Sequence, residues 1–185
     1  MKNYSLLLLF TVFYSLAFGQ VKYDYDKDFD FEAATTYTIV GWQKDSDQIL
    51  NKFDKERLLN ALENEFAARG MSEVKSNADL ELTLYIVVEQ KTSRSAYTTF
   101  NGGYGYRGRW GWGYGGMGSA STSYSESDYL EGTFVIDIYN PETKELVWQG
   151  IITDTVKEKP EKREKSIPKV MKKLMKKYPV KNKKK

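Results

Sequence analysis

The sequence contains no cysteine and no histidine, and these two absences exclude much chemistry. Without cysteine the chain has no disulfide, no thiolate zinc site and no cysteine nucleophile. Without histidine it has no Ser-His-Asp machinery and no imidazole ligand for a metal. A metal site would have to be built from carboxylates and other oxygen groups, and any catalysis would have to proceed without imidazole or thiol groups.

Long hydrophobic runs are also missing. The apolar run Leu6–Leu16 is shorter than the roughly 20 residues that span a bilayer, so no transmembrane span is expected. It follows the basic Lys2 and ends in Ala17-Phe18-Gly19, which places small residues at positions −3 and −1 of a cleavage site after Gly19. This arrangement is typical of a secretory signal peptide. We predict that residues 1–19 are removed and that the mature chain starts at Gln20.

The predicted signal peptide sets the expected compartment. We expect a protein of the periplasm or cell envelope, or a secreted one. Because the chain has no cysteine, it lacks the residue to which a lipoprotein lipid is attached, and we predict that it is not a lipoprotein. The remaining length suits a single domain over residues 20–180, followed by a basic tail at 181–185.

Hydrophobic periodicity predicts five strands and two helices. The strands are expected at residues 21–25, 35–42, 78–90, 129–139 and 145–156. One helix is expected from Asp54 to Arg69, with Gly70 as its terminating residue. The second is expected to start near Ser166, after a charged linker, and to end at Pro179. The order β-β-α-β-β-β-α predicts an α+β domain, a mainly antiparallel sheet with both helices on one face.

Between the third and fourth predicted strands lies a segment of different composition, residues 97–124. It holds 9 of the 14 glycines and eight aromatic residues, but no leucine, isoleucine or valine. Such a segment buries too little aliphatic surface to offset the entropy of ordering its backbone. We therefore predict a flexible glycine-rich and aromatic loop at the end of a hairpin.

This loop supplies the candidate contact residues. Tyrosine and tryptophan faces stack on sugar rings and favour membrane interfaces, and arginine adds charge and cation–π contacts. The candidates are Tyr104, Tyr106, Arg107, Arg109, Trp110, Trp112 and Tyr114. The glycines at 103, 105 and 108 match the spacing of the dinucleotide-binding motif. That motif requires a helix directly after it to bind the pyrophosphate, and the alternating glycines that follow here do not form one. An insertion without a specific ligand is the alternative.

Charge is distributed unevenly along the chain. Residues 157–185 hold 14 Lys or Arg and 3 Glu, whereas residues 20–156 hold 13 basic and 22 acidic residues. A basic end can bind anionic lipid, lipopolysaccharide or an acidic polymer, and nucleic acid is not expected for an exported protein. That alternative places contact on Lys181, Lys183, Lys184 and Lys185. A solvated, frayed terminus explains the same composition.

The acidic ladder Asp24, Asp26, Asp28 and Asp30 opens like a calcium loop. However, Phe29 stands where such a loop needs glycine, and its last ligand is missing. We expect the solvent face of a strand that runs into a loop, with no metal and no cofactor. A pair of carboxylates could in principle hydrolyse glycosides, but no pair is singled out. We predict a protein that is not an enzyme, with a carboxylate-dependent hydrolase as a further alternative.

Several short motifs resemble a known family. The strongest is Gly132–Asp137, followed by Thr143-Lys144 and Leu146–Gly150. The others are Asp24-Tyr25-Asp26, Asp28-Phe29, Thr36-Tyr37, Arg69-Gly70, Ala78-Asp79-Leu80 and Tyr178-Pro179. Together they resemble the bacterial envelope family called domain of unknown function 4136, over nearly the whole mature chain. The resemblance implies an exported α+β domain, often a lipoprotein, with no established activity and no catalytic residues to transfer.

The leading hypothesis is therefore an exported cell-envelope protein without catalytic activity, a binding or structural domain whose loop contacts a partner. The expected partner is a glycan, peptidoglycan, a lipid surface or another envelope protein.

Overall fold

The computed structural model describes residues 20–100 and 120–183, with side chains described outside 95–100 and 120–125. The predicted signal peptide and the seven candidate contact residues lie outside the described residues.

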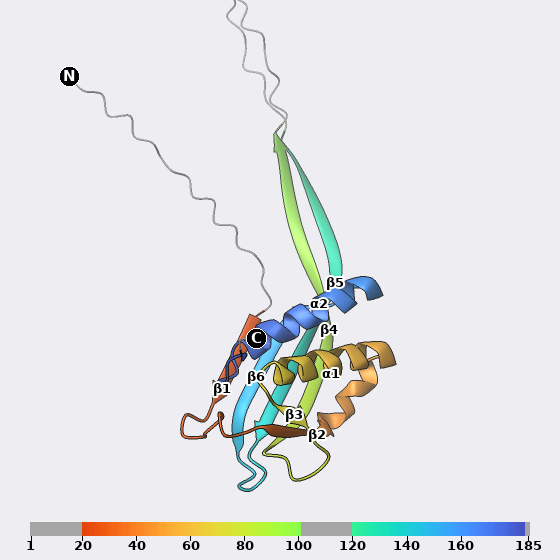
Figure 1. The fold of residues 1–185 in the computed structure, drawn as a ribbon. Coiled ribbons are helices and arrows are strands. Elements are labelled where there is room, and N and C mark those ends of the chain that lie inside the picture. Colours follow the sequence, from red (N-terminus) through yellow and green to blue (C-terminus); the bar gives the residue numbers. More distant parts are fainter. Residues whose placement is uncertain (1–19, 101–119, 184–185) are drawn as a thin grey trace, which may run out of the picture.

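One six-stranded sheet forms the centre of the fold (Figure 1). Its strands are β1 Gln20–Tyr25, β2 Thr36–Trp42, β3 Ser72–Glu73, β4 Leu80–Phe100, β5 Ala120–Tyr139 and β6 Leu146–Thr155. Their order in the sheet is β1-β6-β5-β4-β2-β3. Two α-helices, α1 Lys52–Ala67 and α2 Pro160–Met175, and a 3-10 segment, η1 Gln43–Ile49, complete the described elements.

The sheet is mixed, which corrects part of the predicted architecture. β1, β6, β5 and β4 pair in an antiparallel manner, as expected, but β2 runs parallel to both β4 and β3. The predicted order also lacked η1 and β3. Helix α1 crosses over between β2 and β4, and such a crossover brings two strands together in parallel. β3 has two residues, too few to produce a hydrophobic period.

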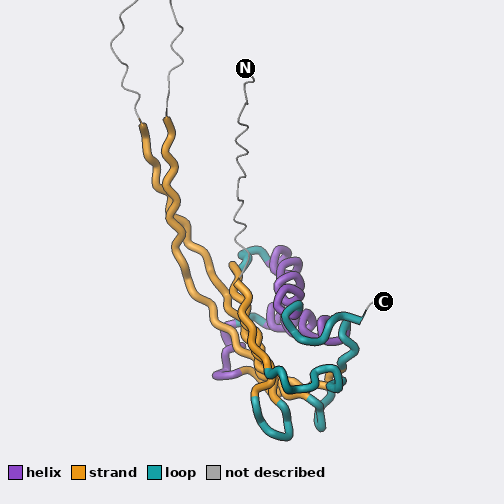
Figure 2. Tube along the Cα trace, turned by 90° about the vertical axis from the view of Figure 1, so that its left-hand side faces the viewer, coloured by secondary structure: helices purple, strands orange, loops and turns teal. Residues whose placement is uncertain are grey.

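Helices α1 and α2 cover the same face of the sheet, as predicted (Figure 2). The alternating residues of the long strands point toward them, since Leu82 and Leu84 of β4 and Ile136 of β5 are fully buried. Phe66 of α1 and Leu174 of α2 meet them from the other side. Each such side chain contributes about 1.5–3 kcal/mol on leaving water, before entropy is counted.

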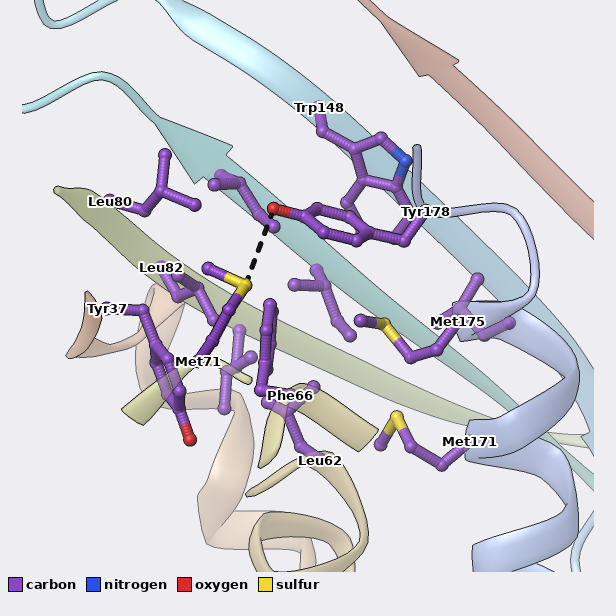
Figure 3. Close-up of a cluster of buried hydrophobic side chains, with 14 of the residues drawn as sticks. Tyr37, Leu62, Phe66, Met71, Leu80, Leu82, Trp148, Met171, Met175 and Tyr178 are labelled. Atoms are coloured by element: carbon purple, nitrogen blue, oxygen red, sulfur yellow. Dashed lines mark hydrogen bonds between the residues drawn. The ribbon is translucent and has the colours of Figure 1, made fainter. Parts of the chain in front are cut away.

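Tyr178 lies at the centre of the core, just after α2 (Figure 3). Its ring packs edge-on against Phe66, Trp148 and Phe31 at centroid separations of 5.5–5.6 Å. Its hydroxyl donates to the sulfur of Met71 at 3.9 Å. Desolvation is the main cause that raises the pKa of Tyr178, so the phenol stays neutral. This residue therefore fastens the end of α2 to α1 and to the sheet.

Helix α2 begins six residues earlier than the sequence indicates, at Pro160 and not near Ser166. Pro168 is consequently inside the helix, where a missing N–H usually costs about 3 kcal/mol. The early turns are held by Arg163, which donates to the carbonyls of Lys157 and Glu158 and forms an ion pair with Asp54 of α1. The region predicted as a charged linker is thus mostly the first turns of α2.

Strands β4 and β5 extend far beyond the rest of the sheet (Figures 1 and 2). β6 pairs with β5 as far as Glu131, and β2 pairs with β4 as far as Leu84, whereas β4 and β5 stay paired out to Phe100 and Ala120. We call residues 90–100 and 120–130 the ribbon. The ends of the predicted loop, 97–100 and 120–124, are therefore strand, and its middle, 101–119, lies outside the described residues.

Candidate functional site

The ribbon is held in register by polar pairs across its two strands. Arg94 and Glu126 lie opposite each other, and Nε of Arg94 is 2.7 Å from Oε1 of Glu126. Closer to the body, Oγ1 of Thr92 donates to Oδ1 of Asp128 at 2.8 Å. These pairs are exposed, so each contributes only a few tenths of a kcal/mol. They nevertheless disfavour a register slip, which would separate the partners.

The ribbon determines where the predicted contact segment starts and ends. At about 3.4 Å per residue, the strand from Gln90 to Phe100 carries the chain roughly 34 Å. Phe100 and Ala120 are paired, so residues 101–119 leave and return at one point. The seven candidate residues, from Tyr104 to Tyr114, belong to this segment. Their identification stays a prediction.

An apolar cavity of about 120 Å³ lies at the base of the ribbon, between the two helices and the sheet. Ile86 and Phe134 line it from the sheet, Leu58 from α1, and Val170 and Met171 from α2. Gly132 of β5 also lines it. Mainly apolar walls of this kind accommodate small apolar groups.

The rim of this cavity carries a buried carboxylate, Asp54, which is 7% exposed. Nη1 of Arg57 lies 2.7 Å from its Oδ1, and Nε of Arg163 lies 2.9 Å from its Oδ2. Burial acts to raise the pKa of Asp54, but hydrogen bonds from Arg57, Arg163 and Asn51 outweigh it and lower the pKa. A carboxylate held ionised by two guanidinium groups joins the helices and has no proton to donate near neutral pH.

A second buried carboxylate, Asp137, lies on the face of the sheet away from the helices, at 7% exposure. Nε2 of Gln43 donates to its Oδ2 at 2.8 Å, and Nε2 of Gln149 donates to its Oδ1 at 2.7 Å. Gln43 also donates to Oγ1 of Thr83 at 2.7 Å. Asp137 thus joins η1 to β5 through the amide of Gln43, and β5 to β6 through the amide of Gln149. No second acid takes part in these contacts, so they do not form a carboxylate pair of the glycosidase type.

The acidic ladder forms local turns. Oδ1 of Asp26 accepts the N–H of Asp28, and Oδ1 of Asp30 accepts the N–H groups of Glu32 and Ala33. Such bonds are the usual reason for aspartate in turns. Within residues 20–100 and 120–183, no group of three or more acidic side chains is arranged to hold a metal ion.

The C-terminal end of the chain packs against the end of α1 up to Lys183. The buried Arg69 donates to the carbonyl of Val180 at 3.0 Å and to that of Met175 at 2.6 Å. The N–H of Lys183 donates to the carbonyl of Ala68. The predicted basic tail is therefore attached at its start. Over the described stretches, no helix is both long and apolar enough to cross a membrane.

Comparison with known families identifies the domain. Residues 21–180 match the family described as Domain of unknown function (DUF4136). The chain belongs to this family. No curated protein matches the chain. The match to DUF4136 confirms the resemblance found in the sequence motifs and leaves the activity open.

Solved structures with a similar fold have very different sequences. A PDZ domain protein from Parabacteroides distasonis matches 88% of this chain with a TM-score of 0.50 and 12% identity. The present chain spans 36% of that protein, and the likeness shows the fold alone. The PelC dodecamer from Paraburkholderia phytofirmans is 9% identical, with a TM-score of 0.48, and the match covers 85% of this chain and 96% of that chain. That score is too low to support an inference.

The motifs that carry the DUF4136 resemblance have structural roles. Oδ2 of Asp79 accepts both the N–H and the hydroxyl of Thr36, and the same groups of Thr35. The indole of Trp148 lies over Gly150, where a Cβ would be 2.1 Å from the ring. Nζ of Lys144 is 3.0 Å from Oε2 of Glu81 across the sheet. Sequence reasoning missed these contacts because most join residues distant in the chain.

Proposed function

We propose that this DUF4136 protein is an exported cell-envelope protein without catalytic activity, which binds a partner through the segment at the end of its ribbon. The observation that carries the proposal is the ribbon itself. A two-stranded hairpin of this length without a third strand has little independent stability. The ribbon is attached to a packed body and its polar side chains are paired across the two strands. Such a ribbon has a use if it presents residues 101–119 to a partner.

The composition of the displayed segment supports binding to a carbohydrate or an interface. Trp110 and Trp112 alternate with glycine, so little side-chain bulk stands between successive aromatic faces. Arg107 and Arg109 add positive charge beside them. Aromatic faces next to guanidinium groups suit sugar rings that carry acidic groups, as in an envelope glycan or peptidoglycan.

A deletion that preserves the body tests this proposal. Residues 101–119 are replaced with Asn-Gly, a two-residue turn that connects paired strands without strain. The protein starting at Gln20 is incubated with isolated envelopes and with purified peptidoglycan, and the bound fraction is measured. We expect the deletion to abolish retention while the circular dichroism spectrum and melting temperature stay unchanged. Unchanged retention would remove the segment from the function.

Export is a separate part of the proposal and has its own test. We expect the protein to be found outside the cytoplasm with Gln20 as its first residue, which intact-mass measurement reads directly. Replacement of Leu7, Leu8 and Leu9 with glutamine should retain the precursor in the cell, because it destroys the apolar run that a signal peptide needs. An intact Met1 on the exported protein would contradict cleavage.

The two alternative functions would each require a different set of residues. A basic-tail binder requires Lys181, Lys183, Lys184 and Lys185 to carry the affinity, and it predicts steep weakening with salt. A carboxylate-dependent hydrolase requires two convergent acids. The support for a non-catalytic protein is that the buried acids of the described residues, Asp54 and Asp137, are each engaged by guanidinium or amide donors.

A further inference from the structure

The outer surface of α2 carries a straight row of lysines. They recur at intervals of three and four residues, the spacing that keeps side chains on one line along a helix. The row, which we call the lysine crest, consists of Lys162, Lys165, Lys169, Lys172 and Lys176. All five are exposed. At 1.5 Å per residue the crest is about 21 Å long.

The crest lies opposite the buried side of the helix. At 100° per residue, Val170, Met171 and Leu174 point toward the sheet, and the crest lies about 180° away from them. Met171 and Leu174 are fully buried, which fixes the rotation of the helix. The lysines therefore form the outermost line of α2, on the side of the molecule away from the sheet.

Among the described residues, none of the five crest lysines forms an ion pair within 4 Å. Lysines that do form one include Lys52, Lys55, Lys91 and Lys144, which lie outside the crest. No acidic residue occurs after Glu164. Like charges three and four residues apart on a helix repel each other. An external anionic surface would remove that repulsion.

We propose that the lysine crest docks the protein onto an anionic membrane surface, with α2 lying flat on the lipid headgroups. The inference goes beyond the proposed function, because it concerns a different surface and does not involve the ribbon. Phosphate or carboxylate headgroups are the groups that lysine ammonium ions bind there. The crest contains no large apolar side chain, so the contact is electrostatic and α2 does not insert.

The shape of the crest favours a plane over a chain-like polyanion. Sites that hold a charged polymer are usually grooves with cations on both walls. A convex helix presents one line of cations, all of which reach a flat surface together. The neighbouring helix α1 exposes Glu56 and Glu63, so repulsion disfavours docking through α1. The membrane is therefore predicted to contact α2 preferentially.

The test compares two triple variants of equal net charge. The crest variant is Lys165→Gln, Lys169→Gln and Lys172→Gln. The matched control is Lys22→Gln, Lys27→Gln and Lys75→Gln, all exposed and outside α2. Both are made in the chain that starts at Gln20, which contains every described element. Binding to vesicles of phosphatidylcholine with 30% phosphatidylglycerol, a composition chosen for the assay, is measured by sedimentation from low to high salt.

A lysine near an anionic surface strengthens binding about fivefold. We expect the crest variant to lose roughly a hundredfold of the partition coefficient at low salt and the control to lose only a few-fold. Binding of the wild type should vanish on pure phosphatidylcholine. Equal losses in both variants would overturn the proposal, because net charge and not position would then explain binding. No binding by the wild type would overturn it too.

Three further measurements distinguish this proposal from related ones. Replacement of Lys181, Lys183, Lys184 and Lys185 by glutamine should weaken binding less than the crest variant does, and a greater loss would assign the contact to the tail. Soluble polyglutamate should compete weakly, and tighter binding to it than to vesicles would make the ligand a polymer. Deletion of residues 101–119 should leave vesicle binding unchanged, so a failure of the ribbon hypothesis is distinguishable from a failure here.

Discussion

At the scale of single residues, Gly150 is the position where the family motif is most tightly constrained. Its neighbour Trp148 is fully buried and its ring occupies the space where a Cβ would be. We expect Gly150→Ala to lower the free energy of unfolding by about 1–3 kcal/mol or more, because an overpacked core cannot move the indole aside. Urea unfolding measures the loss.

Gly132→Ala is the matched control for that substitution. Gly132 also lies in the sheet, but a Cβ there would meet a methyl group of the half-buried Val156 at 3.1 Å. This contact can relax, so the loss should be smaller. Equal losses at the two glycines would show that the indole is not the cause.

Arg69 is the second residue on which the fold depends. Its guanidinium group is buried and satisfies the carbonyls of Met175 and Val180, near the end of the described chain. Arg69→Met keeps the apolar volume but leaves those carbonyls and the carboxylate of Glu65 without a donor. We expect a loss of about 3–5 kcal/mol in chemical denaturation. The exposed Arg94→Met should change stability by no more than about 0.5 kcal/mol, and a similarly small effect at Arg69 would contradict this role.

At the scale of elements, the contact between α2 and the sheet leaves space that a larger side chain can fill. Val170 borders the apolar cavity, and isoleucine adds one methylene group there. We expect Val170→Ile to raise the free energy of unfolding by up to about 0.8 kcal/mol. Val40→Ile, at a position that is 62% exposed, should have no effect. A destabilised Val170→Ile protein would mean that the cavity cannot accept the group.

Sequence patterns predicted those elements whose signal is local. The inward residues of β4 and β5 follow from a period of two, and α1 follows from the spacing of Leu58, Leu62 and Phe66. The parallel pairing of β2 was missed because the hydrophobic pattern of a strand does not indicate which other strand it pairs with. The start of α2 was missed because Ser166 is a residue type that favours a helix N-cap, whereas tertiary contacts of Arg163 hold a longer helix.

The features of the candidate sites also differ in whether a local sequence pattern predicts them. Composition alone identified the segment around Trp110, and the structure adds the ribbon that leads to it. The ion pair between Asp54 and Arg163 joins residues 109 positions apart, so no local motif indicates it. Lys169, Lys172 and Lys176 of the lysine crest fall within the helix that the sequence predicts, but Lys162 and Lys165 lie before its predicted start. The full crest and its position opposite the core therefore required the fold.

At the scale of the whole molecule, acid should unfold the protein. Hydrogen bonds from the backbone N–H of Thr35 and from the side chain of Thr36 lower the pKa of Asp79, and the pKa of Asp54 is also lowered. A carboxylate whose folded pKa lies below its unfolded value near 3.9 stabilises the fold above that value. The stabilisation is lost as the pH falls through the folded pKa.

We therefore expect the free energy of unfolding, measured in urea, to be steady near neutral pH and to fall below about pH 4. Asp79→Asn should flatten part of that fall, because the amide does not titrate. Asp28→Asn, in an exposed turn, should leave the profile unchanged. A wild-type profile that stays level down to pH 2 would contradict the assigned interactions.

At this scale, the central proposal is that a packed α+β body displays a binding segment at the end of a two-stranded ribbon. The most direct test keeps the full ribbon and removes only the aromatic faces. The five substitutions are Tyr104→Ser, Tyr106→Ser, Trp110→Ser, Trp112→Ser and Tyr114→Ser, and the measurement is the fraction retained by purified peptidoglycan and by isolated envelopes. The account predicts that retention falls to the level of the 101–119 deletion while the melting temperature is unchanged. Retention equal to that of the wild type would contradict it.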